Sequence, residues 1–125
     1  MKALVLVAAV AALPAVAVFT GCASSGSSEM PREIRSVQYT LASGKTFESV
    51  VTEAATRRRW MAQKLANGTM RCTLEQRENR VVADVVPMPG GTFDIRCVES
   101  NIPARKYNQW ADNLRREIVF RANNR

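Results

Sequence analysis

The sequence contains no histidine, so every catalytic mechanism and metal site that needs an imidazole is excluded. It also lacks a C-x-x-C pair, a glycine-rich phosphate loop and a carboxylate pair with the spacing of a known motif. These absences predict that the chain is not an enzyme and that it holds neither a metal ion nor an organic cofactor.

Charge is absent from Ala3 to Phe19, a stretch preceded by the single lysine Lys2. A charged start, an apolar core and small residues at the exit are typical of a secretory signal peptide, here residues 1–21, which is cleaved. The alternative is a retained transmembrane helix, which needs about 20 apolar residues. We favour the signal peptide because the run is slightly short, contains Pro14 and has no basic cluster behind it.

The residues FTGC, Phe19 to Cys22, resemble the lipobox of bacterial lipoproteins, although leucine usually stands where this chain has Phe19. The resemblance implies that Cys22 receives a diacylglyceryl group, becomes the new N-terminus and is N-acylated. Ala23 follows, where aspartate would usually signal retention in the inner membrane. The same resemblance implies an anchor in the outer membrane of a Gram-negative cell, with the folded domain in the periplasm.

Residues 22–33 read CASSGSSEMPRE, a serine- and glycine-rich composition that predicts a flexible tether. About eleven residues at about 3.3 Å each would reach roughly 35 Å when fully extended. The lipid on Cys22 would supply the membrane affinity, and residues 34–125 would form one folded domain.

Acidic residues are outnumbered: the chain has 18 Lys and Arg against 11 Asp and Glu, a net charge of +7. A basic surface usually binds nucleic acid, but export argues against that partner. Anionic lipid head groups and acidic envelope polymers such as peptidoglycan are better candidates. The simpler interpretation, which we favour, is a solvated surface kept soluble by its charge.

Two segments show the periodicity of amphipathic helices. Residues 46–59 have Thr46 as predicted N-cap, arginines at the end that suit the helix dipole, and one apolar face formed by Phe47, Val50, Val51, Ala54 and Ala55. Residues 103–120 carry an apolar stripe of Tyr107, Trp110, Ala111, Leu114 and Ile118.

Four segments between these helices have strand patterns. Residues 60–65 and 69–75 flank Asn67-Gly68, which predicts a hairpin with a type I′ turn and positive φ at both residues. Residues 80–86 and 92–98 alternate apolar and polar side chains.

The expected fold is α+β: one small domain of order α-β-β-β-β-α, with a four-stranded antiparallel meander and two helices packed on one face. The opposite face would meet water through Arg71, Thr73, Glu75, Asp84, Asp94 and Arg96. Residues 34–41 are a candidate short strand outside this arrangement.

The domain is similar to small uncharacterised Gram-negative outer-membrane lipoproteins that share a tryptophan after the first helix, a glycine turn and a last helix with the pattern YNxW...L...I. The matching positions here are Trp60, Gly68, Leu74, Arg77, Ser100, Asn101, Tyr107, Asn108, Trp110, Leu114 and Ile118. The resemblance covers residues 46–120 and implies a shared fold, but the family supplies no activity.

Three segments are candidates for binding. The segment RRRW, formed by Arg57, Arg58, Arg59 and Trp60, would suit lipid head groups or glycan phosphates. The aromatic pair of YNQW, Tyr107 and Trp110, lies one helical turn apart and would stack on a sugar, and the loop PMPGG exposes Met88 to a partner. For each we favour the simpler interpretation: a helix end with a buried tryptophan, a core stripe and an ordinary turn.

After lipidation two cysteines remain, Cys72 and Cys97, and an even count in an oxidising compartment ordinarily means a disulfide. The meander places residues 80–86 between their strands, so their Cα atoms would lie roughly 9–10 Å apart, beyond the reach of a disulfide. We favour two free packed thiols, Cys72 opposite Ala83 and Cys97 near Val81, over a bond between them.

Two functions remain open from the sequence. The first is a structural or accessory role, in which the lipid-anchored chain docks to another envelope protein through one face or edge of its sheet. The second is a small binding module for an anionic envelope ligand, a lipid head group or peptidoglycan. The positions of five arginines would discriminate between the two functions. Convergence on one concave patch would favour the binding module, and scatter would favour the docking role; the arginines are Arg57, Arg58, Arg59, Arg71 and Arg96.

Overall fold

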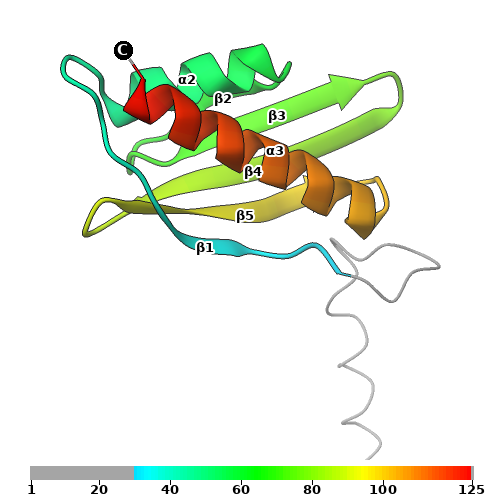
Figure 1. Cartoon of the computed structure of the whole chain (residues 1–125). Coiled ribbons are helices and arrows are strands. Elements are labelled where there is room, and N and C mark those ends of the chain that lie inside the picture. Colours follow the sequence, from blue (N-terminus) through cyan, green and yellow to red (C-terminus); the bar gives the residue numbers. More distant parts are fainter. Residues whose placement is uncertain (1–29, 125) are drawn as a thin grey trace, which may run out of the picture.

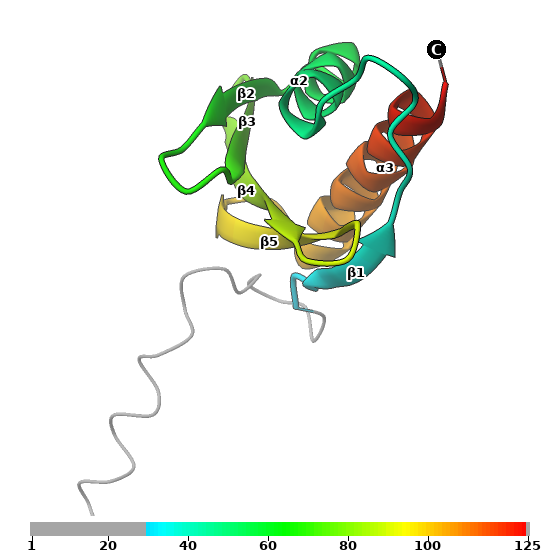
Figure 2. The same ribbon diagram turned by 90° about the vertical axis from the view of Figure 1, so that its left-hand side faces the viewer.

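The computed structural model describes residues 30–124. In this part of the chain the elements are, in order, β1 (Ile34–Gln38), α2 (Phe47–Arg57), β2 (Met61–Lys64), β3 (Met70–Gln76), β4 (Asn79–Met88), β5 (Thr92–Ser100) and α3 (Ala104–Asn123). Both helices lie on the same face of the sheet (Figures 1 and 2) and contact each other. The predicted α+β class and its layer of two helices are therefore confirmed. No helix within the described range is long and apolar enough to cross a membrane.

The sheet has the order β1-β5-β4-β3-β2, with every neighbouring pair antiparallel. Strands β2 to β5 form the predicted meander. The prediction of four strands is wrong, because β1 pairs with the outer edge of β5 as a fifth strand. The sequence of β1 is too short to reveal this pairing, which depends on an edge formed almost sixty residues later.

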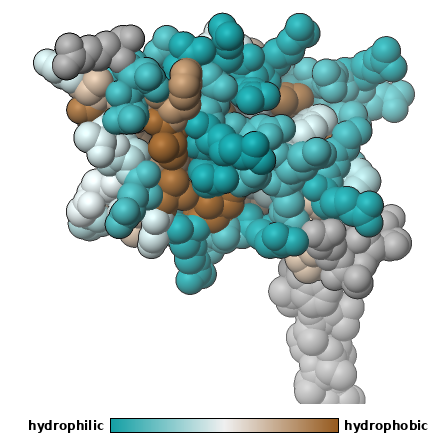
Figure 3. Space-filling view, viewed as in Figure 1, coloured by the Kyte–Doolittle hydropathy of each residue, from teal (hydrophilic) through white to brown (hydrophobic). Residues whose placement is uncertain are grey.

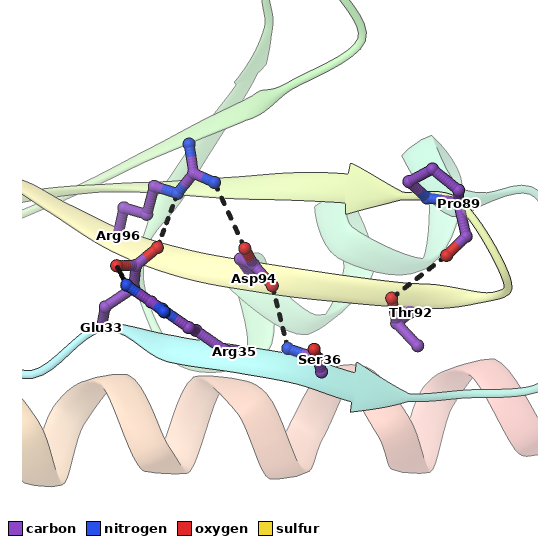
Figure 4. Close-up of polar contacts among 7 residues, drawn as sticks. All are labelled: Glu33, Arg35, Ser36, Pro89, Thr92, Asp94 and Arg96. Atoms are coloured by element: carbon purple, nitrogen blue, oxygen red, sulfur yellow. Dashed lines mark hydrogen bonds and ion pairs between the residues drawn. The ribbon is translucent and has the colours of Figure 1, made fainter.

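The pairing between β1 and β5 is irregular. Ser36 has a positive φ of 55°, and the register shifts between Ile34 and Val37. The Ser36 N–H donates to Asp94 Oδ1 at 2.9 Å, and Arg96 Nη2 donates to Asp94 Oδ2 at 3.2 Å (Figure 4). Asp94 was expected to meet water, but it is only 5% exposed. That expectation is wrong because β1 lies beside it.

The core lies between the sheet and the helices, on the predicted faces. Strand β3 buries Met70, Cys72 and Leu74, α2 buries Val50, Val51, Ala54 and Ala55, and α3 buries Tyr107, Ala111, Leu114 and Ile118. Two residues of the predicted apolar faces, Phe47 and Trp110, are only half-buried at the margin of this core.

The start of α2 confirms the predicted cap. Thr46 Oγ1 accepts the Ser49 N–H at 3.1 Å, and Ser49 Oγ accepts the Thr46 N–H at 3.2 Å, which satisfies two donors that a helix start leaves open. The helix ends at Arg57, two residues before the predicted end, and α3 continues to Asn123.

The hairpin at Asn67-Gly68 forms between β2 and β3, but the predicted type I′ turn is wrong. Gly68 has a φ of +89°, whereas Asn67 is not among the residues with positive φ. The Leu65 N–H donates to Thr69 O at 2.8 Å, and the Gly68 N–H donates to Leu65 O at 3.0 Å. This is a three-residue loop that ends in one left-handed glycine.

Cys72 and Cys97 form no disulfide with each other, as we favoured. Cys72 lies opposite Ala83, as predicted, and Ala83 in turn lies opposite Cys97, so β4 separates the thiols. The predicted neighbour of Cys97 is replaced by Ala83, since Val81 pairs with Ser100. Cys72 is fully buried and Cys97 is half-buried.

Candidate functional site

One cleft brings together Arg58, Arg59, Trp60 and Trp110, which the sequence places in two separate segments. It has a volume of about 240 Å³ and lies where the end of α2, the end of β3 and the middle of α3 meet. We call it the tryptophan cleft; its lining residues are Arg58, Arg59, Trp60, Leu74, Gln76, Trp110 and Asn113. The segments RRRW and YNQW, which the sequence presents as separate candidates, thus contribute to one site.

The α2 wall of the cleft is set by the way that helix ends. The Trp60 N–H donates to Ala55 O at 2.8 Å, and the Arg59 N–H donates to Thr56 O at 3.1 Å, which is the Schellman pattern. Arg59 occupies the left-handed position of this motif, with a φ of 70°, where glycine is usual. The turn leaves Trp60 only 3% exposed, while Arg59 stays at the surface.

The opposite wall comes from α3. Trp110 is half-buried, so part of its indole faces the cleft. Lys106 Nζ lies 5.6 Å from the centroid of the Trp110 ring, a cation–π contact that adds a positive charge beside those of Arg58 and Arg59. Tyr107 is fully buried and does not line the cleft, so the core interpretation holds for Tyr107.

The arginines at the end of α2 differ in their partners. Arg58 Nε lies 3.4 Å from Glu117 Oε1. Arg57 and Arg59 make no side-chain ion pair or hydrogen bond with other residues in the range 30–124. Within the cleft, Arg59 is therefore a cation that no described carboxylate neutralises.

A neighbouring groove offers less to an anion. Figure 3 shows the helical face as mainly hydrophilic, with one hydrophobic band. The groove, of about 440 Å³, is lined by Arg57, Arg58, Glu117, Phe120 and Arg121. Arg58 pairs with Glu117, and Arg121 pairs with both Glu117 and Glu53, so two of the three arginines that line the groove have carboxylate partners within the domain.

The other two arginines of the predicted set lie on the open face of the sheet. Arg71 donates from Nε and Nη2 to the two carboxylate oxygens of Asp84, at 2.8 and 2.9 Å. Arg96 Nε donates to Glu33 Oε2 at 2.8 Å. These carboxylates raise the pKa of both guanidinium groups. The five arginines therefore do not converge on one patch.

Several residues of the cleft escaped sequence reasoning. Gln76 and Asn113 line the cleft and Lys106 lies against Trp110, but none of the three belongs to a motif, and no signal distinguishes them from ordinary surface residues. Met88, the candidate in PMPGG, is 36% exposed at the end of β4 and does not line the tryptophan cleft. Within residues 30–124, no group of three His, Cys, Asp or Glu side chains is placed to hold a metal ion.

The predicted signal peptide 1–21, the lipidation site Cys22 and the tether up to residue 29 lie outside the described residues. The described chain contacts α3 from its first residue. Asn108 Nδ2 donates to Met30 O at 3.2 Å, and Asn108 Oδ1 accepts the Arg32 N–H at 2.8 Å.

Comparison of the chain with protein-family models, with curated proteins and with solved structures gives no match. A role for the tryptophan cleft therefore has to be argued from its own residues.

Proposed function

We propose that this chain is a lipid-anchored protein of the bacterial envelope whose domain binds an anionic ligand and catalyses no reaction. The anchor is Cys22 in FTGC, followed by the serine- and glycine-rich tether. The observation that carries the binding role is the tryptophan cleft, where both tryptophans of the chain meet Arg59, with Lys106 beside them.

The positive charge at the cleft exceeds what the fold needs. The C-terminal end of a helix carries the equivalent of about half a negative charge, which a single arginine at the end of α2 would offset. Arg58 has Glu117 as its partner, and Lys106 rests against an aromatic ring. Since no carboxylate from residues 30–124 lines the cleft, an anion that entered would meet Arg59 and Lys106 without competition from that part of the chain.

Docking to another envelope protein through the open face of the sheet is the second candidate. The scatter of the five arginines favours it by the criterion drawn from the sequence. We give it less weight because Arg71 and Arg96, which lie on that face, are held by Asp84, Glu33 and Asp94. Each of these two guanidinium groups forms two hydrogen bonds to carboxylates of the domain, which balance its charge.

The emission of the two tryptophans tests the proposal, because both line the cleft. The lipidated chain, held in a detergent with neither sugar nor charge, is titrated with inorganic phosphate, glycerol 3-phosphate and glucose 6-phosphate. We expect a saturable change with at least one anion that weakens as sodium chloride is raised. The double change Arg58→Gln with Arg59→Gln should abolish it, whereas Arg35→Gln, at the opposite edge of the sheet, should not. No response to any anion would refute the binding role.

A further inference from the structure

The tryptophan cleft presents three kinds of chemical group to one ligand. The half-buried indole of Trp110 offers an apolar surface, Arg59 offers a guanidinium, and the amides of Gln76 and Asn113 offer donors and acceptors. A guanidinium binds phosphate or carboxylate through paired N–H donors. Amides bind hydroxyl groups, and the negative face of an indole attracts the weakly positive C–H bonds of a sugar ring.

The backbone at Arg59 places its side chain at the wall of the cleft. A left-handed conformation is unfavourable for any residue with a Cβ, and glycine is the usual occupant of this position in a Schellman motif. Arg59 holds φ at 70°, yet its guanidinium has no side-chain partner in the described part of the chain. Arg77 combines a positive φ with the same lack of a side-chain partner, so what distinguishes Arg59 is its place in the wall of the cleft, where a ligand would supply the missing partner.

The size of the cleft limits the ligand. A volume of about 240 Å³ falls below the roughly 300–1,000 Å³ of sites that enclose drug-sized molecules. One sugar ring with one acidic group is of suitable size, whereas an oligosaccharide or a nucleotide would extend out of the cleft.

We propose that the tryptophan cleft binds a single sugar unit that carries a phosphate or carboxylate group. The acidic group lies against Arg59 and Lys106, the ring packs on Trp110, and Gln76 and Asn113 bind its hydroxyl groups. This inference rests on the proposed binding role and adds the class of ligand. Such a unit is presented either as a free sugar acid or as part of a larger envelope glycan or glycolipid.

Calorimetry and tryptophan emission with matched probes test this class of ligand. We expect glucose 6-phosphate or glucuronic acid to bind at least tenfold more tightly than glucose, inorganic phosphate or glycerol 3-phosphate. The last of these represents a phospholipid head group without a ring. Equal affinity for glycerol 3-phosphate, or tighter binding of adenosine monophosphate, would overturn the sugar assignment while leaving anion binding intact.

A pair of variants separates binding from stability. Arg59→Gly removes the guanidinium and relieves the left-handed strain, so affinity should fall at least tenfold while the melting temperature does not fall. Arg77→Gly is the matched control, because Arg77 also has a positive φ, of 60°, and does not line the cleft. It should leave the affinity unchanged. Wild-type affinity in Arg59→Gly, or an equal loss in both variants, would overturn the proposal. Trp110→Leu, measured by calorimetry, should abolish the preference for the sugar over phosphate.

Discussion

Asp94 Oδ1 accepts the backbone N–H of Ser36 at 2.9 Å, and this bond joins edge strand β1 to β5 where the ladder between them is irregular. A bulge leaves backbone groups without a ladder partner, and here a side-chain carboxylate takes that place. The same carboxylate accepts a hydrogen bond from Arg96. A single aspartate thus links the irregular part of β1 to β5.

Replacement of Asp94 should loosen this entry. We expect Asp94→Ala to lower the free energy of unfolding by about 1–2 kcal/mol, because the Ser36 N–H loses its acceptor. Asp94→Asn should cost less, since its amide oxygen still accepts that hydrogen bond. Denaturant unfolding measures both, and equal losses in the two variants would contradict the role given to Oδ1.

Replacement of Gly68 by any residue with a side chain should destabilise the domain. The φ of +89° at Gly68 favours glycine, so Gly68→Val should destabilise the domain by about 1–2 kcal/mol. Ala66→Val is the control in the same loop, because Ala66 has no positive φ, and it should change stability much less. A comparable melting temperature for the two variants would argue against the turn.

Replacement of Arg77 by glycine should stabilise the domain. Arg77 is the first of the two residues between Gln76 and Asn79, which pair across the β3–β4 hairpin, and it alone of those two has a positive φ. That pattern matches a type II′ turn, which favours glycine first. Arg77→Gly should raise the free energy of unfolding by about 1 kcal/mol. Unfolding in urea measures the gain, and a loss of stability would show that the Arg77 side chain contributes to the fold.

The buried thiol of Cys72 predicts a pH dependence. Burial, and to a lesser extent the charge of Asp84, raises the pKa of Cys72 from 9.0 to about 12. The unfolded chain loses this proton at lower pH than the folded one, so the stabilisation is complete below pH 9 and declines as pH rises towards 12. Wild type should therefore lose stability more steeply over this interval than Cys72→Ala.

Alkylation of the denatured, unreduced chain should label both Cys72 and Cys97, and no labelling would reveal a bond between them.

Attachment to the membrane should depend on Cys22. Cys22→Ser should abolish the added lipid mass and release the chain from membranes, as mass spectrometry and fractionation would show. A variant that stayed on membranes through salt and carbonate washes would indicate that the apolar run from Ala3 to Phe19 is retained as a helix.

The sequence by itself determined the elements whose signals are local. The periodicity of residues 46–59 and 103–120 predicted both helices, and Thr46 predicted the start of the first. Alternation in the strands placed Cys72 opposite Ala83 and kept the two thiols apart. These features follow from side chains a few residues apart, which helix and strand geometry bring to one face.

Only the tertiary structure decided the features that join distant segments. The candidate strand at residues 34–41 forms β1, but it joins the sheet because β5 offers an edge, and Asp94 is buried because β1 lies beside it. Trp60 and Trp110 line one cleft because α3 crosses the sheet close to the end of α2. Arg59 ends a helix without the expected glycine, so no local signal marked its strained position. Such contacts depend on how layers pack against each other, which the pattern within any one segment does not encode.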